Sequence, residues 1–338
     1  MNRELAMKIA NAVLYEGYLL YPYRPSAIKN RQRWSFGILY PPAYEDVRRG
    51  TERSYMHSEC LLRAGAGAQL TIQLRFLHLL THEVLQAVGD YLEPAASLVI
   101  DGRLLETRDE AMERSVQFDL EYSGAFQQQF DFRFDSMDET ESLHNRDGRS
   151  VGEIRRSQDE VHGTINVCSQ TLQESLLKLS LDVRNTTVLP GYANDRDSAL
   201  LASLLSAHTM LTVSGGEFIS LLEPPDELRS EVKACNNIGN FPVLVGDTGA
   251  REMILCSPIL LYDYPQIAPE SAGDFYDATE MDEMLTLRVL TLTDEEKDEM
   301  RSGDDRIRNL LQRTEQSARE QLTKTHGTIR SLRPASDQ

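Results

Sequence analysis

Apolar side chains recur at every second position through much of the first 190 residues, and this alternation restricts the region to folds built from half-buried β-strands. The clearest runs cover residues 70–76, 116–120, 130–134 and 177–183. The dipeptide Asp101-Gly102 separates two further apolar runs and can supply the positive φ angles of a two-residue hairpin turn. Several such strands joined by short turns predict an antiparallel sheet or sandwich in the N-terminal part of the chain.

Two helices are predicted within the same region. Leu5, Ile9 and Val13 lie at helical spacing, which predicts an opening helix over residues 3–16. We also interpret residues 81–93 as one helix between two strands. The first part of the chain, residues 1–190, is therefore expected to be a β-rich domain that carries an N-terminal helix.

The pattern changes near residue 190, where we place a domain boundary. Asp197 can cap a helix that runs to about residue 208, and a hairpin is expected around Ser214-Gly215-Gly216. A further helix is expected to begin near Asp226, after two prolines. Further strands are predicted at 242–246, 253–262 and 285–292. Residues 191–293 are thus expected to form a smaller α/β part.

The C-terminal region is expected to be helical. Thr293 and Glu296 have the spacing of a capping box, in which each side chain bonds to the backbone amide of the other residue. Helices are predicted over residues 294–325, and residues 326–338 are expected to form a flexible tail. The fold class predicted for the whole chain is α+β.

Charge excludes some partners. The chain of 338 residues has 35 Lys and Arg against 53 Asp and Glu, a formal net charge of −18. Attraction to phosphate backbones and to anionic lipid needs positive potential, so no nucleic-acid partner is expected.

The four cysteines and the hydropathy bear on the compartment. Cysteines at positions scattered through a chain this large are expected to be reduced thiols rather than a disulfide framework. The first twenty residues do not fit a signal peptide, because charged residues interrupt the apolar run. No stretch approaches the roughly 18 to 20 apolar residues that cross a bilayer, so no membrane span is predicted. A cytoplasmic location is therefore expected.

One pair of histidines has the spacing of a metal site. On a helix, His78 and His82 would point to the same side, with Glu83 adjacent, and Cys60 could add a thiolate. Zinc or nickel would suit such ligands. The order differs from that of zinc proteases, because Leu79 rather than a glutamate follows the first histidine. The alternative interpretation is two histidines satisfied by ordinary hydrogen bonds.

Motifs for other chemistry are incomplete. The triplet Asp247-Thr248-Gly249 occurs once, whereas an aspartic protease brings two copies together. The Gly-Lys-Ser/Thr of a phosphate-binding loop is absent, and Ser214 lacks the Gly-x-Ser-x-Gly elbow. We therefore assign no catalytic residue and expect no cofactor.

The most unusual segment spans residues 15–44, which hold a third of the chain's aromatic residues together with several basic ones. Aromatic and Arg side chains carry much of the energy at protein interfaces. The candidate partner-binding residues are Tyr18, Tyr21, Tyr23, Arg24, Arg31, Arg33, Trp34 and Tyr40. The equally weighted alternative is that the tyrosines pack this arm onto the sheet while the basic residues offset acidic surface.

Three stretches, residues 11–44, 221–247 and 257–301, resemble a family of bacterial accessory proteins encoded beside uptake [NiFe]-hydrogenase structural and maturation genes. They cover a little under a third of the chain, and YLLYPYRPSAIKN, residues 18–30, is the most recognisable part. The resemblance implies a role in making or supporting the hydrogenase, and hence a protein partner. It implies no catalytic residues.

The sequence therefore leads to one functional hypothesis with two alternatives. We expect a non-enzymatic accessory or assembly protein that binds a hydrogenase subunit or maturation factor through residues 18–44. The first alternative is a metal-dependent enzyme or metal-delivery protein that uses His78, His82, Glu83 and Cys60. The second, by fold analogy alone, is a β-sandwich that binds a small molecule or saccharide.

Overall fold

A computed structural model describes residues 2–24, 27, 30, 36–48, 51–122, 125–173, 175–189, 195–267, 275–277 and 282–325. The chain divides into two compact units. The first, which we call the sheet unit, comprises Met1–Gly17 and Trp34–Gln266. The second, the helical unit, comprises Tyr18–Arg33 and Ile267–Gln338.

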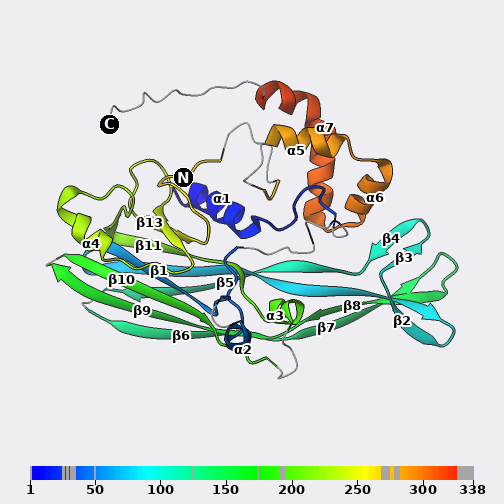
Figure 1. Cartoon of the computed structure of the whole chain (residues 1–338), viewed down its shortest axis with the longest axis horizontal. Coiled ribbons are helices and arrows are strands. Elements are labelled where there is room, and N and C mark those ends of the chain that lie inside the picture. Colours follow the sequence, from blue (N-terminus) through cyan, green and yellow to red (C-terminus); the bar gives the residue numbers. More distant parts are fainter. Residues whose placement is uncertain are drawn as a thin grey trace. The chain divides into compact units, whose positions relative to one another are not determined.

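The sheet unit is organised around one very long strand, β1 (Tyr55–Val88). Its 34 residues would span about 110 Å if the strand were straight. Different partners pair with it, all antiparallel, along its length: β10 (Leu176–Asn185), β11 (Leu205–Ile219), β5 (Arg108–Glu121), β8 (Ser150–Gln158) and β2 (Tyr91–Ala95). Figure 1 shows these strands running side by side along the length of β1.

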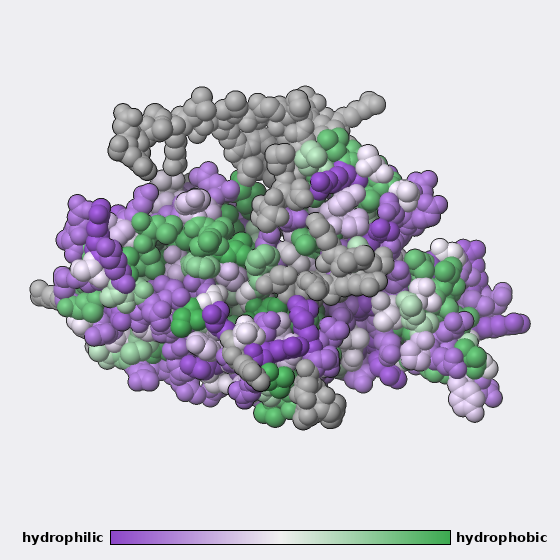
Figure 2. All heavy atoms as spheres, viewed as in Figure 1, coloured by the Kyte–Doolittle hydropathy of each residue, from purple (hydrophilic) through white to green (hydrophobic). Residues whose placement is uncertain are grey.

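The remaining strands extend this sheet on both sides. β11 pairs with β13 (Met253–Ser257), which pairs with β12 (Phe241–Leu244). β10 pairs with β9 (Val161–Gln173), which pairs with β6 (Gln127–Phe134), while β7 (Met137–His144) pairs with β8. A separate two-stranded sheet consists of β3 (Ser97–Ile100) and β4 (Arg103–Glu106). Hydrophobic residues reach the surface over the end of the sheet that carries β2, β3 and β4 (Figure 2).

The alternation seen in the sequence becomes the main core. Every second residue of β1 and β10 turns inward, and the buried set includes Ile72, Leu74, Phe76, Leu179 and Leu181. A second core lies under the first helix, α1 (Asn2–Tyr15), whose apolar face packs on β11 and β13. The predicted antiparallel sheet, the opening helix and the α+β fold class are confirmed.

Two local predictions are confirmed in detail. Asp101 and Gly102 have φ angles of 52° and 87° and connect β3 to β4. The side chain of Thr293 accepts a hydrogen bond from the Glu296 amide, and the Glu296 carboxylate accepts one from the Thr293 amide. This capping box begins α6 (Asp294–Ser302).

The predicted helix over residues 81–93 is wrong, because β1 continues to Val88. Thr81 and His82 pair with β5 on one side and with β8 on the other. Ladder hydrogen bonds to two neighbours outweigh the weak local preference of this segment.

Three predictions beyond residue 190 also change. The hairpin around Ser214-Gly215-Gly216 is instead a continuous strand, β11, which is out of register with β1 between Ala64 and Gln69. The helix expected from Asp197 is short: α3 (Arg196–Leu201) is capped by Asp195. The strand expected at 285–292 is a helix, α5 (Asp282–Leu290).

The units do not follow the predicted boundary near residue 190. β10 and β11 lie on either side of that boundary in sequence, yet both pair with β1 in one sheet. The remaining helices of the sheet unit are α2 (Pro42–Val47) and α4 (Arg229–Lys233). The predicted tail, residues 326–338, lies outside the described residues.

The helical unit contains α5, α6 and α7 (Asp305–Thr325). Both α5 and α6 contact α7, and the buried side chains are Leu285, Val289, Met300, Ile307, Leu310 and Leu311. Across the described ranges, no helix has the length and apolar character needed to span a bilayer.

Replacing a fully buried side chain of β1 is expected to destabilise the sheet unit. Ile72→Ala should lower the free energy of unfolding by about 2–5 kcal/mol, because Ile72 is fully buried and the lost methyl groups leave a cavity. Val99→Ala is the control, since this side chain is 64% exposed and its loss should change the free energy by less than about 0.5 kcal/mol. Urea denaturation measures both, and equal effects would contradict the assigned core.

Candidate functional site

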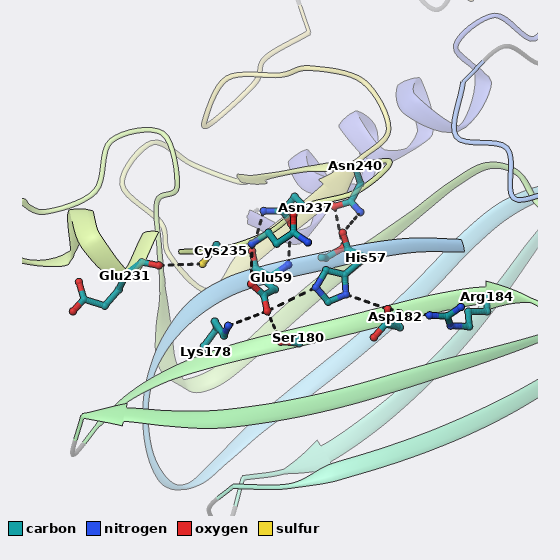
Figure 3. Close-up of polar contacts among 12 residues, drawn as sticks. His57, Glu59, Lys178, Ser180, Asp182, Arg184, Glu231, Cys235, Asn237 and Asn240 are labelled. Carbon is teal, nitrogen blue, oxygen red and sulfur yellow. Dashed lines mark hydrogen bonds and ion pairs between the residues drawn. The ribbon is translucent and has the colours of Figure 1, made fainter. Parts of the chain in front are cut away.

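A connected set of polar side chains lies on the face of β1 and β10 that points away from the main core. On β1, Met56, Ser58 and Cys60 are buried, while His57 and Glu59 project from the opposite face. In the β1–β10 register, His57 is opposite Asp182 and Glu59 is opposite Ser180. We call the set His57, Glu59, Lys178, Ser180 and Asp182 the polar ladder (Figure 3).

Glu59 is the centre of the polar ladder. One carboxylate oxygen, Oε2, accepts the Asn236 amide at 2.8 Å. The other, Oε1, lies 3.0 Å from the Lys178 ammonium and accepts the Ser180 hydroxyl at 3.1 Å. Only 10% of the Glu59 side chain is exposed, so these contacts replace most of its hydration.

Opposing influences determine the pKa of Glu59. Burial is the largest single influence and raises the pKa, but the Asn236 amide, Lys178 and Ser180 together outweigh it. The pKa of Glu59 is therefore lower than its ordinary value, and the carboxylate is ionised at neutral pH.

His57 lies between two carboxylates. Its Nδ1 atom is 3.1 Å from an oxygen of Asp182, and its Nε2 atom is 3.7 Å from an oxygen of Glu59. Arg184, next on the same face, contacts Asp182 at 3.8 Å and stacks on the ring of Tyr55 with 4.8 Å between the guanidinium carbon and the ring centroid. The cations Lys178 and Arg184 thus lie on either side of the two carboxylates on the surface of the two strands.

An asparagine-rich loop, residues 235–240, binds the other edge of β1 beside the polar ladder. Ile238 pairs with His57 through two backbone hydrogen bonds, of 3.0 and 2.8 Å. The side-chain amide of Asn237 bonds to both backbone groups of Glu59, and that of Asn240 donates to the His57 carbonyl. Because β11 pairs with β1 only from Leu61 onward, this loop takes the place of a strand at that end of β1.

The loop also forms one wall of a cleft of about 490 Å³. The other walls come from the segments on either side of α2 and from residues near β12 and β13. The residues that line the cleft are Phe36, Gly37, Ile38, Leu39, Thr51, Glu52, Arg53, Tyr55, Asn237, Ile238, Gly239, Phe241 and Pro258. The polar ladder therefore holds a loop whose outer side faces a cavity large enough for a small ligand or a short peptide segment.

The tyrosines and Arg24 of the predicted partner-binding arm make contacts inside the protein. Tyr18, Tyr23 and Tyr40 are buried, and the Tyr23 hydroxyl donates to the Phe275 carbonyl at 2.9 Å. Arg24 lies 3.0 Å from Glu296 and 3.4 Å from Glu299. The Arg288 guanidinium stacks on the Tyr21 ring.

Tyr18, Tyr23 and Tyr40 are thus covered, and Arg24 is paired with acidic residues of α6. The packing alternative named the sheet, whereas Tyr23 and Arg24 contact residues of the helical unit. The other three candidates, Arg31, Arg33 and Trp34, lie outside the described residues. Of the aromatic segment, Phe36 is the side chain most exposed among the described aromatic residues, at 37%. It lines the cleft.

The four residues of the metal alternative are not gathered by the fold. His78 and His82 are on the same face of β1, about 13 Å apart along the strand rather than about 6 Å apart on a helix. Glu83 faces the other side and lies 3.7 Å from Arg155, whereas Cys60 is in the main core, opposite Leu179. Within the described segments, no three His, Cys, Asp or Glu side chains are placed to hold a metal ion.

Both histidines are in surroundings that disfavour protonation. Burial, with a smaller contribution from the nearby Arg114, lowers the pKa of His78 to about 4. Burial also lowers the pKa of His82, with Arg108 contributing. At neutral pH each of these imidazoles is therefore uncharged.

Sequence comparisons add little to this geometry. No protein-family model matches the chain, and no curated protein is similar to it. Among solved structures, the chain is similar to the Salmonella SPI-1 type III secretion injectisome secretin InvG (residues 176-end) in the open gate state, at 12% identity and a TM-score of 0.16. That match covers 60% of this chain and spans about half, 51%, of the secretin chain. A TM-score this low carries no argument about fold or function.

The polar ladder has no motif that marks it in the sequence. Its one visible signal was the polar side of the alternating run in β10, where Lys178, Ser180 and Asp182 separate the leucines. Their partners His57 and Glu59 lie about 120 residues earlier, and only strand pairing brings the two sets together.

Removing the charge of Glu59 is expected to destabilise the protein at neutral pH. Glu59→Gln should lower the free energy of unfolding by about 1–3 kcal/mol, because Lys178 and the Asn236 amide lose an ionised partner. Since the folded-state pKa of Glu59 is lowered, its stabilisation is complete above the unfolded-state pKa of about 4.3 and is lost as the pH falls through the folded-state value.

Urea denaturation from pH 7 to pH 3 measures this difference. The gap between wild type and Glu59→Gln should narrow as the pH falls below about 4.3. The exposed Asp226, whose Asp226→Asn change should have little effect at either pH, is the control. A gap that stays constant with pH would contradict an ionised Glu59 at the centre of the polar ladder.

The thiols are expected to differ sharply in reactivity. Burial raises the pKa of Cys60 and Cys256, and it raises the pKa of Cys235 to about 11, so the reactive thiolate is scarce at these positions. Cys168 is exposed. Native protein should therefore show one fast-reacting thiol toward a disulfide reagent, which Cys168→Ser removes, and all four should react after unfolding. Fast reaction of the Cys168→Ser protein would contradict the burial of the others.

Proposed function

We propose that this protein is a non-enzymatic accessory or assembly protein that binds another polypeptide, and that the partner is a [NiFe]-hydrogenase subunit or maturation factor. The binding role is supported by an exposed apolar surface on the sheet unit. The choice of partner is supported by the resemblance of residues 11–44, 221–247 and 257–301 to hydrogenase-associated proteins. We also propose that the protein acts in the cytoplasm, where its free cysteines would remain reduced.

The proposal depends on exposed apolar residues at the end of the sheet where β1 finishes. Val88, Tyr91, Leu92 and Val99 are large apolar or aromatic residues there, and each is more than 40% exposed. We call these four residues the apolar tip. Figure 2 shows hydrophobic atoms at this end among hydrophilic ones. Apolar groups gathered on a surface favour association with a partner, because covering them removes them from water.

The strands of the apolar tip are well placed to meet a partner. β2 pairs with β1, and none of the described strands pairs with its second edge. Pro94 interrupts the donors of that edge, a feature that limits indiscriminate strand addition. The tip therefore offers side chains for recognition more readily than a long free backbone edge.

Contacts elsewhere give less support to the metal-dependent alternative. His78, His82, Glu83 and Cys60 do not converge on a common point, and the charged groups of the polar ladder are paired with one another. An enzyme of this kind would have to use groups other than those four.

Co-expression with hydrogenase subunits and maturation factors tests the proposal. One of these proteins should co-purify with the wild-type chain, and Tyr91→Asp with Leu92→Asp should reduce its recovery at least tenfold by placing charge in the apolar tip. Val188→Asp is the matched control, since Val188 is 89% exposed and outside the tip. All variants should keep the wild-type thermal transition.

Two outcomes would contradict the proposal. If none of the hydrogenase proteins co-purifies with the wild-type chain, the partner class is wrong. If the double variant retains the partner as well as Val188→Asp does, the apolar tip is not the binding surface.

A further inference from the structure

The cleft beside the polar ladder contains an interruption in the backbone pairing of β1. The Asn185 amide donates to the Ser54 carbonyl at 2.8 Å, while the Ser54 amide donates to the Glu45 carboxylate at 3.0 Å. From this register, the backbone groups of Met56 and of every second residue after it point toward β10. Those of Tyr55 and His57 must then point the other way. His57 follows this rule, because its amide and carbonyl both bond to Ile238.

Among the described residues, Tyr55 has no such partner. On this same edge the Arg53 carbonyl accepts the Tyr40 amide at 2.8 Å, and two residues after Tyr55 the loop begins to pair at His57. Between them, no described residue forms a backbone hydrogen bond with the amide or carbonyl of Tyr55 on the side away from β10. Within the part of the chain that the structure describes, one donor and one acceptor at this strand edge thus have no backbone partner, and Tyr55 lines the cleft.

The walls of the cleft complement an apolar side chain. Phe36 and Phe241 line the cleft and are 37% and 42% exposed, and Ile38 and Pro258 add aliphatic surface. The backbone also approaches closely here, since Gly37 has a φ of 58° and a β-carbon at that position would lie 2.7 Å from Pro258. A partly apolar concavity with a few directed polar groups is typical of a binding site.

The charged residues of the cleft wall limit which charges a bound segment can carry. Arg53 lines the cleft, is exposed and has no ion-pair partner among the described residues, so a carboxylate on the occupant would complement it. Glu52 lines the cleft as well. A strongly acidic segment would therefore be repelled, and one carboxylate fits this wall better than several.

We propose that the cleft binds an extended segment of another polypeptide, which pairs with the edge of Tyr55 that points away from β10. An apolar side chain of the segment lies against the aromatic lining, and one carboxylate lies near Arg53. This is strand addition at a single position, with specificity supplied by the pocket. The inference deepens the proposed function and rests on it only for the identity of the natural partner.

A random peptide library displayed on phage, selected on the full chain, supplies the probe. The most enriched peptide, made synthetically with a fluorescein label, is titrated against the protein by fluorescence anisotropy. Phe241→Arg should weaken peptide binding at least tenfold, because it replaces an apolar ring of the cleft with a charged side chain. Arg53→Glu should lower the affinity for peptides that carry a carboxylate, because it removes the cation proposed to pair with that group. Tyr262→Arg is the matched control, since Tyr262 is 86% exposed and does not line the cleft, and it should leave the affinity unchanged.

A second measurement tests the backbone pairing. Methylating single backbone nitrogens of the peptide removes one donor at a time, and at one position it should weaken binding at least tenfold. No enrichment over the bare support, or equal binding to wild type and Phe241→Arg, would overturn the site. Binding that no backbone methylation weakens would overturn strand addition. Self-association of the chain that Phe241→Arg abolishes, without peptide binding, would overturn the peptide as occupant in favour of a second copy.

The outcome is separable from that of the proposed function. The peptide measurement uses no hydrogenase protein, and the Tyr91→Asp, Leu92→Asp variant should bind the peptide as wild type does. If the peptide binds but no hydrogenase protein co-purifies, the peptide-binding cleft is supported and the proposed hydrogenase partner is wrong. If a hydrogenase protein co-purifies equally well with wild type and Phe241→Arg, and no peptide binds, the hydrogenase partner is supported and the peptide-binding cleft is wrong.

Discussion

The sheet unit depends on the hydrogen bonding of a single strand along both of its edges. β1 pairs with β10 near its beginning, with β11 and β5 through its middle, and with β8 and β2 near its end. The backbone of β1 therefore positions all five of these neighbouring strands. Where a neighbour is missing, the structure supplies a substitute, as the asparagine-rich loop does beside His57 and Glu59, or leaves an opening, as at Tyr55.

The polar ladder and the cleft are two consequences of the same pairing. The β1–β10 register sets His57 opposite Asp182 and brings Lys178 to Glu59, so that the Glu59 carboxylate can hold the Asn236 amide. That contact anchors the loop, and the loop forms a wall of the cleft. The polar ladder has the residue types of a catalytic site, but its contacts are structural. It holds in place the loop that forms one wall of the cleft where a peptide segment is proposed to bind.

The composition of the aromatic arm alone does not decide whether its residues bind a partner or pack within the chain. Tyr18, Tyr23 and Arg24 have the chemistry of an interface, and in the structure they meet carbonyl and carboxylate groups of the helical unit instead. The groups that favour partners also favour packing a segment onto its own chain, since both depend on burying large rings and pairing guanidinium groups. The surfaces proposed for partners, the apolar tip and the cleft, are consequently built mainly from other residues.

The sequence by itself determined the features that depend on neighbouring residues: the alternating strands, the Asp101-Gly102 turn, the opening helix and the capping box at Thr293. These follow from local backbone preference and from one buried face. Only the tertiary structure decided that residues 81–88 extend β1, that residues 214–216 continue a strand, and that Glu59 meets Lys178. Each of these depends on hydrogen bonds or charge contacts with segments distant in sequence. Short-range periodicity does not indicate which distant segments will pair.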